Sequence, residues 1–169
     1  MTKTLRNLPS YVITLFILFC SCDNKSLNEI SMIKYQEKEV KESLRGFYSD
    51  IISNSTFRLF QYYDQDTNLI YRIELNLNDD TAIVFNGEKI YKLSEKQFII
   101  DDKVFNISKY YYDIANQYDE EAYVFVNLSI GLIGINYFPW GLSIFPQGEN
   151  IPVELNKLLF EVDSKSFFE

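Results

Sequence analysis

Histidine is absent from the 169 residues of the chain, and cysteine occurs only as Cys20 and Cys22. Without an imidazole the chain cannot build a Ser-His-Asp or Cys-His catalytic group, a zinc site with histidine ligands, or a haem with an axial histidine. Hydrophobic residues make up 47% of the chain and charged residues 24%, which excludes collagen-like and wholly disordered classes. We therefore expect a folded domain, and the sequence reveals no catalytic residue, metal or cofactor for it.

Positive charge is also scarce, because 16 Lys and Arg stand against 24 Asp and Glu, for a net charge of −8. Proteins that bind nucleic acid neutralise phosphates with clustered Lys and Arg. The acidic balance predicts no nucleic-acid partner. A strongly negative small domain is instead suited to steering onto a basic protein partner.

The amino-terminal residues have the layout of a secretory signal. Lys3 and Arg6 precede an apolar run over residues 11–19, and no acidic residue lies among residues 1–9. At 1.5 Å per residue this run covers about half of a ~30 Å hydrocarbon core, so it is too short for a stable spanning helix.

The apolar run ends in the sequence Phe19-Cys20-Ser21-Cys22-Asp23. A cysteine behind an apolar run, with a small residue before it, resembles the lipobox of bacterial lipoprotein precursors, although Phe19 stands where Leu is commonest and Cys20 where Ala or Ser is. The resemblance implies cleavage after Ser21 and attachment of diacylglycerol, with further acylation such as palmitate, at Cys22. Ordinary cleavage after Cys22 is the alternative. The lipobox implies a membrane-anchored protein of the bacterial cell envelope, at the outer membrane and facing the periplasm or the cell surface.

These features divide the chain into a signal peptide over residues 1–21, a lipidated cysteine and tether over residues 22–36, and one α+β domain over residues 37–169. Loss of the signal removes Lys3 and Arg6 but no acid, so the side-chain charge becomes −10. Two or three acyl chains are needed for durable attachment, because a single chain holds only marginally.

Helical spacing marks both ends of the domain. Residues 37–53 place Val40, Leu44, Phe47 and Ile51 on one stripe, which predicts an amino-terminal helix. Pro152 could open a closing helix that puts Leu155, Leu158, Leu159 and Val162 on one face.

Between these helices the hydrophobic period is two. Tyr71, Ile73, Leu75 and Leu77 alternate with polar residues, and Asn86-Gly87 joins two apolar runs as a hairpin turn. Residues 128–145 carry almost no charge, which favours central strands buried on both faces. The fold class we predict is α+β, mainly an antiparallel meander that forms an open sheet or a half-barrel.

Acidic residues cluster at predicted turns. Residues 64–68 begin like a calcium loop, but Leu69 and Leu75 stand where that loop needs Gly and Glu. The pairs at 79–80 and 101–102 and the run at 119–121 are typical of wet turns rather than of carboxylates that face each other across a cleft.

Aromatic residues provide the remaining candidate site, at Tyr110, Tyr111, Tyr112, Tyr137 and Trp140. Neighbours on a strand point to opposite faces, so three consecutive tyrosines must expose a ring or bury both faces of the sheet. Exposed rings could form a stacking platform for a sugar or a peptide, whereas packing within a β core is the other interpretation.

The functional prediction is a lipid-anchored envelope protein with a non-enzymatic binding domain, of which an immunity- or inhibitor-like role is one form. Two alternatives stay open. The first is a carrier of an apolar ligand in a barrel cavity, and the second is an envelope glycan hydrolase that works without histidine.

Overall fold

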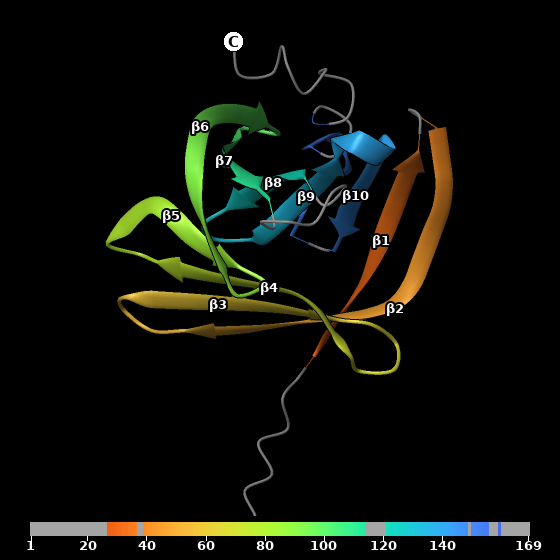
Figure 1. Cartoon of the computed structure of the whole chain (residues 1–169), viewed down its shortest axis with the longest axis horizontal. Coiled ribbons are helices and arrows are strands. Elements are labelled where there is room, and N and C mark those ends of the chain that lie inside the picture. Colours follow the sequence, from red (N-terminus) through yellow and green to blue (C-terminus); the bar gives the residue numbers. More distant parts are fainter. Residues whose placement is uncertain (1–26, 37–38, 114–120, 149, 156–158, 160–169) are drawn as a thin grey trace, which may run out of the picture.

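A closed antiparallel barrel forms the body of the computed structural model, which describes residues 27–36, 39–113, 121–148, 150–155 and 159. Each strand pairs with its neighbours in the chain, and β1 also pairs with β10 to close the barrel (Figure 1). The elements are β1 (Asn28–Gln36), β2 (Glu39–Ser53), β3 (Phe57–Tyr63), β4 (Leu69–Asn76), β5 (Asp79–Phe85), β6 (Glu88–Ile100), β7 (Lys103–Tyr112), β8 (Ala122–Asn127), β9 (Gly131–Tyr137), the 3-10 turn η1 (Phe138–Trp140) and β10 (Leu142–Gln147).

Tight turns set the strand order. Asn86 and Gly87 have φ angles of 50° and 92° between β5 and β6, so the predicted hairpin is confirmed. Asp101 and Asp102 also have positive φ, at 48° and 59°, and they turn the chain from β6 into β7. Aspartate tolerates this left-handed region better than most residues.

The predicted amino-terminal helix is wrong, because residues 39–53 form the long strand β2. The helix-like spacing arises from a bulge. Leu44 lies opposite Met32, but Phe47 lies opposite Ile30, so β2 uses one more residue than β1 between these two pairs. Gly46, with a φ of 79°, lies at this irregularity. One extra residue turns the strand period of two into a local spacing of three.

The α+β fold class is therefore also wrong, because the described chain is nearly all antiparallel β. The predicted open sheet or half-barrel is wrong as well, because the sheet closes into a barrel. At the carboxyl end, residues 153–155 are helical, and Leu155 is fully buried. Most of the predicted closing helix, including Leu158 and Val162, lies outside the described residues. No helix in the described part of the chain is long and apolar enough to span a bilayer.

The stretch expected to be a tether also differs, because Asn28–Gln36 is β1 and belongs to the barrel. Its side chains alternate, and Met32 is only 1% exposed. Strand pairing on both edges satisfies the backbone of β1, which a free tether would leave to water.

Two apolar clusters flank the barrel wall. The first fills the interior with bulky side chains, among them Phe60, Ile73, Phe85, Tyr110 and Leu132. The second lies outside β6 to β10, where Phe105, Phe125, Ile133 and Phe145 pack with Leu155 and Leu159. The carboxyl-terminal leucines thus cover the outer surface of one side of the barrel.

Candidate functional site: an aromatic cap and a barrel-end cavity

The three consecutive tyrosines of β7 divide between the two faces of the barrel wall. Tyr110 and Tyr112 belong to the interior cluster and are 0% and 6% exposed. Tyr111 lies outside, with its ring centroid 6.0 Å from that of Tyr123 on β8. The sequence-predicted set is therefore not one surface, because two of its members are core residues.

Tyr137 and Trp140, the other two predicted residues, do lie together. Their rings stack with centroids 6.0 Å apart and planes 21° from parallel, and the Trp140 side chain is 51% exposed. Tyr137 ends β9, and Trp140 ends the 3-10 turn η1 that follows it. Gly141 closes this turn at a φ of 59°, and its N–H donates to the carbonyl of Phe138.

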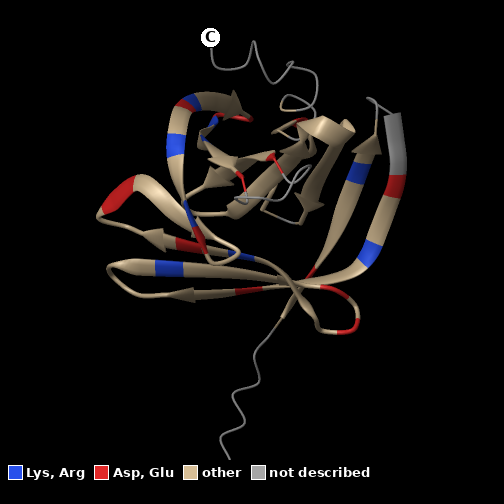
Figure 2. Cartoon of the chain, viewed as in Figure 1, with Lys and Arg blue, Asp and Glu red and all other residues tan. Residues whose placement is uncertain are grey.

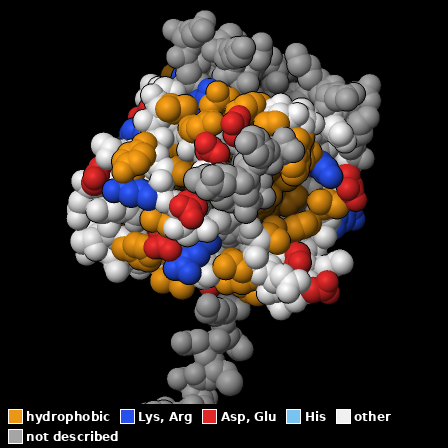
Figure 3. Space-filling view, viewed as in Figure 1, with side chains coloured by type: hydrophobic (Ala, Val, Ile, Leu, Met, Phe, Trp, Pro, Cys, Tyr) orange, Lys and Arg blue, Asp and Glu red, His pale blue; other side chains and the backbone are white. Residues whose placement is uncertain are grey.

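Phe138 of the same turn faces the outer rings. Its centroid lies 5.1 Å from that of Tyr123 and 6.4 Å from that of Tyr111, and 38% of the residue is exposed. Figure 3 shows hydrophobic side chains beside scattered charges on one face of the molecule. We call Tyr111, Tyr123, Tyr137, Phe138 and Trp140 the aromatic cap.

The cap rests on the barrel interior through Tyr71 of β4. Tyr71 has a hydrogen bond with Tyr137, and its ring stacks on Phe85, which in turn meets Tyr112 edge to face at 4.9 Å. Burial raises the pKa of Tyr71, and the Tyr137 hydroxyl adds to the shift. Because each ring contacts the next, the orientation of Tyr137 beneath Trp140 is fixed by the core.

A buried lysine stands beside the cap. The Lys109 ammonium lies 3.8 Å from the centroid of the Tyr123 ring, close enough for a cation–π contact, and the residue is only 6% exposed. Burial lowers the pKa of Lys109. The outer part of the cap therefore carries a positive group under its aromatic surface.

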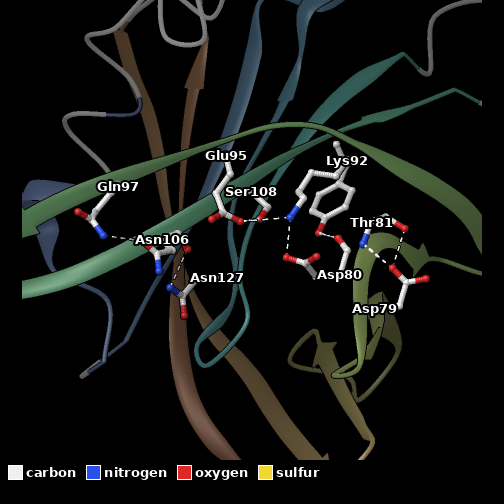
Figure 4. A network of polar contacts seen from close by, with 10 residues as sticks. Asp79, Asp80, Thr81, Lys92, Glu95, Gln97, Asn106, Ser108 and Asn127 are labelled. Atoms are coloured by element: carbon white, nitrogen blue, oxygen red, sulfur yellow. Dashed lines mark hydrogen bonds and ion pairs between the residues drawn. The ribbon is translucent and has the colours of Figure 1, made fainter.

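The main polar network of the barrel lies elsewhere, on β5, β6 and β7 (Figure 4). The Lys92 ammonium contacts Asp80 at 2.5 Å and Glu95 at 3.3 Å, and Ser108 donates to the same Glu95 carboxylate at 2.9 Å. Burial alone would lower the pKa of Lys92, but the hydrogen bonds and charges of the two acids together raise it. The lysine thus lies between the two carboxylates and compensates both.

The aspartate side chains at two turns accept hydrogen bonds from the backbone of the same turn. Asp64 accepts hydrogen bonds from the backbone N–H groups of Asp66 and Asn68, and Asp79 accepts from Thr81. The pKa of both carboxyl groups is lowered, first by hydrogen bonds from the Asn68 side-chain amide and the Thr81 hydroxyl and then by these backbone bonds. No group of acidic residues or cysteines within the described ranges is arranged to hold a metal ion. Asp119 and Glu120 lie outside those ranges.

A cavity of about 340 Å³ opens at one end of the barrel. Its lining comes from β1, β2, β3 and the turns that follow β8 and β10, and it includes Asn28, Ile30, Ser49, Ile51, Phe60 and Tyr62. Strands alternate in direction around the barrel, so the start of β1 and the end of β9 lie at opposite ends. We call the end with the cavity the proximal end and the end with the aromatic cap the distal end.

Sequence reasoning missed Tyr123 and Phe138 of the cap and the residues that line the cavity, although a barrel cavity was one of its alternatives. Tyr123 pairs directly with Tyr111, but only the β7–β8 register shows this pairing. Phe138 meets Tyr111 and Tyr123 through the pairing of β7, β8 and β9, whereas Tyr71 and the cavity residues come together only when the barrel closes. Cys22 and Ser21, the predicted lipidation and cleavage residues, lie outside the described residues.

Comparison with known proteins adds no family to this geometry. No protein family matches the chain, and neither a curated protein nor a solved structure is detectably similar to it.

Proposed function

We propose that the chain is a lipid-anchored protein of the bacterial cell envelope that binds a partner through its aromatic cap without transforming it. The observation that carries the proposal is the turn η1, which holds Trp140 half-exposed on the ring of Tyr137. An exposed ring with a fixed orientation loses little conformational freedom on binding, and Trp and Tyr dominate the energetics of protein interfaces.

The position of the cap supports this role. Anchoring at Cys22 would act on the start of β1, at the proximal end, whereas the cap lies at the distal end. A partner could therefore reach Trp140 and Phe138 while the opposite end of the barrel is held near the bilayer.

The carboxylates support binding rather than glycan hydrolysis. A glycosidase needs two carboxyl groups that face each other across the substrate, with one of them free to act as an acid. Asp80 and Glu95, which converge, both contact the Lys92 ammonium, and Asp79 is engaged with Thr81.

A basic protein is the partner class that the charge favours. Figure 2 shows acidic and basic residues spread along the strands without one dominant patch, so steering would come from the overall negative charge. The partner would approach by this charge and then bury the exposed rings of the cap.

The test places a photo-crosslinking amino acid at Phe138 in the full-length chain and identifies what it captures in the native membrane. We expect capture of one basic envelope protein, and its association rate with the purified chain should fall as salt rises. The matched variants are Trp140→Ala in the cap and Tyr91→Ala, a similarly exposed aromatic residue on β6.

Trp140→Ala should weaken binding by about 2 kcal/mol, as expected for a central aromatic residue, and Tyr91→Ala should leave it unchanged. Equal binding by both variants, or an association rate indifferent to salt, would contradict the proposal. The anchor is tested separately by labelling with radioactive palmitate, which Cys22→Ser should abolish.

A further inference from the structure

The proximal cavity combines apolar lining residues with polar ones such as Asn28 and Ser49. Phe60 and Tyr62, which are 1% and 4% exposed, line it from β3, and Ile30 lines it from β1. Ile51 also lines it and is 46% exposed, so the cavity opens to the outside beside this residue. A volume of about 340 Å³ is within the range of small-molecule sites.

Tyr62, one of the lining residues, has a hydroxyl that can donate a hydrogen bond. Its oxygen accepts a bond of 2.7 Å from the backbone N–H of Leu132, and among the described residues none accepts its own hydrogen. Burial raises the pKa of Tyr62, so the hydroxyl keeps that hydrogen at any physiological pH. A ligand in the cavity that offers a carbonyl oxygen would satisfy this donor.

The charge of the lining indicates which carbonyl compounds fit. Glu29 is the charged residue among those lining the cavity, and the described lining contains no Lys or Arg that could pair with a ligand carboxylate. A free fatty acid would bring a second negative charge next to Glu29. An ester of the same acid presents a carbonyl without that charge.

The cavity also lies where lipid would be available. Asn28 begins β1 and lines the cavity, and Cys22 precedes it by six residues. Six residues span at most about 22 Å, so an anchored Cys22 would hold the cavity mouth close to the bilayer surface. Leu27 and Ile52 are the sequence neighbours of the lining residues Asn28 and Ile51, and they are 36% and 45% exposed.

We propose that the proximal cavity binds an acyl chain of an ester lipid, whose carbonyl accepts the hydrogen of the Tyr62 hydroxyl. This inference rests on the proposed anchor only for the source of the lipid. The acyl ester could belong to a membrane phospholipid or to the lipid carried by Cys22 itself, and both have the same chemistry at the cavity.

The experiment uses the full lipidated chain in phosphatidylcholine vesicles. A photoreactive diazirine is placed in the acyl chain of the phosphatidylcholine, and after irradiation the labelled residues are mapped by mass spectrometry. We expect labels on Ile30, Phe60 or Tyr62. When phosphatidylcholine vesicles instead carry a diazirine-bearing free fatty acid, labelling of these residues should be about fivefold lower, because the fatty-acid carboxylate would lie next to Glu29.

In a second arm, cells are fed the diazirine fatty acid and the purified chain is placed in unlabelled vesicles. Labels on the same residues in this arm assign the ligand to the chain's own anchor. Labels in the first arm alone assign it to membrane phospholipid. Labels in neither arm would overturn the proposal.

Two adjacent residues of β2 supply the matched variants. Ile51→Trp narrows the cavity mouth, whereas Ile52→Trp adds the same bulk at an equally exposed position that does not line the cavity. Labelling should fall about tenfold in Ile51→Trp and stay unchanged in Ile52→Trp. Ser49→Phe, which fills the cavity from the same strand, is a second blocking variant in case Ile51→Trp folds poorly. Equal labelling of the Trp pair would overturn the proposal.

The two proposals fail separately. If palmitate does not label Cys22 but added phosphatidylcholine still labels the cavity, the anchor is wrong and the acyl site stands. If Cys22 is labelled and the cavity is not, the acyl site is wrong and the anchor stands.

Discussion

The two sides of the barrel differ in how many of their faces are buried. On the covered wall, β7 to β10, side chains pack inside the barrel and also outside it, and residues 131–135 of β9 are all buried. The open wall, β3 to β5, buries fewer side chains, and in β5 burial alternates, because Ile83 and Phe85 are buried but their neighbours are not. Both walls are antiparallel and belong to one closed sheet.

This difference explains the composition of the two walls. A strand buried on both faces has no position where a charge is inexpensive, and a strand with one wet face has such a position at every second residue. The uncharged run over residues 128–145 predicted burial on both faces; residues 131–135 of β9 confirm it, whereas residues 138–141 of the same run are exposed. Leu155 and Leu159 supply the outer layer that makes this burial possible.

The largest effect should come from Gly131, where the covered wall touches the open wall. A methyl group there would lie 2.5 Å from the Tyr62 hydroxyl and 2.6 Å from the Phe60 ring, and Gly131 has a φ of 95°. Overpacking and backbone strain together should make Gly131→Ala cost about 3–5 kcal/mol of unfolding free energy, measured by urea denaturation.

Gly87→Ala is the control for this change. Gly87 has nearly the same φ, 92°, but no atom lies within 4 Å of the added methyl group. Only the backbone strain remains, so we expect a loss of about 1 kcal/mol. Equal losses at the two glycines would mean that the two walls do not touch at Gly131.

The outer layer of the covered wall gives the next effect. Ile133 is fully buried outside the barrel with Leu155 and Phe145, so Ile133→Ala should cost about 2–5 kcal/mol. Val104→Ala, at a position 55% exposed, should change the unfolding free energy by no more than about 0.5 kcal/mol. Thermal or urea unfolding measures both, and a small loss at Ile133 would show that the outer face is not covered.

Alkaline pH should lower the unfolding free energy, because the hydroxyl groups of two tyrosines of the open wall, Tyr62 and Tyr71, are buried. Burial raises the pKa values of Tyr62 and Tyr71 above that of an unfolded tyrosine, about 10. Above this pH the unfolded state releases protons that the folded state retains. Stability should therefore be constant below about pH 10 and fall above it by up to about 1.4 kcal/mol per pH unit for each group.

Tyr71→Phe should reduce this slope, while Tyr91→Phe, at a position 62% exposed, serves as the control. The measurement is the unfolding free energy of each variant between pH 8 and 12 (chosen as the experimental range around the ordinary tyrosine pKa of about 10). An unchanged slope in Tyr71→Phe would contradict the burial of this phenol.

The smallest effect concerns the ion pairs beside the open wall. Lys92→Met removes the contacts with Asp80 and Glu95, whose side chains are both 41% exposed. Solvent screens such pairs, so we expect a loss of about 0.5–1 kcal/mol that shrinks at high salt. The variant and the unchanged chain should be compared by urea denaturation at low and high salt, and a loss independent of salt would point to packing instead.

The sequence predicted what local chemistry decides. The alternation around Ile73 and Leu75 and the turn at Asn86-Gly87 identified strands and a hairpin correctly. The error at β2 came from a bulge near Gly46, because an extra residue in a strand imitates helical spacing over one turn.

The closure of the barrel and the candidate sites could not be predicted in the same way. Closure depends on the pairing of Ile33 with Phe145, and nothing near either residue specifies the other. For the aromatic residues, the sequence indicated that consecutive tyrosines must divide between two faces. Only the register shows that Tyr111 meets Tyr123, or that Trp140 stacks on Tyr137.

The seam between β1 and β10 has a consequence for how the chain acquires its shape. The ten strands leave two unpaired sheet edges until β10 forms, because β10 pairs with β1, the first strand of the barrel. Contacts so distant in sequence form slowly, and an unpaired edge invites pairing with other chains. The sheet must therefore stay open until β10 has formed, and any chaperone that protects it should hold one of these two edges.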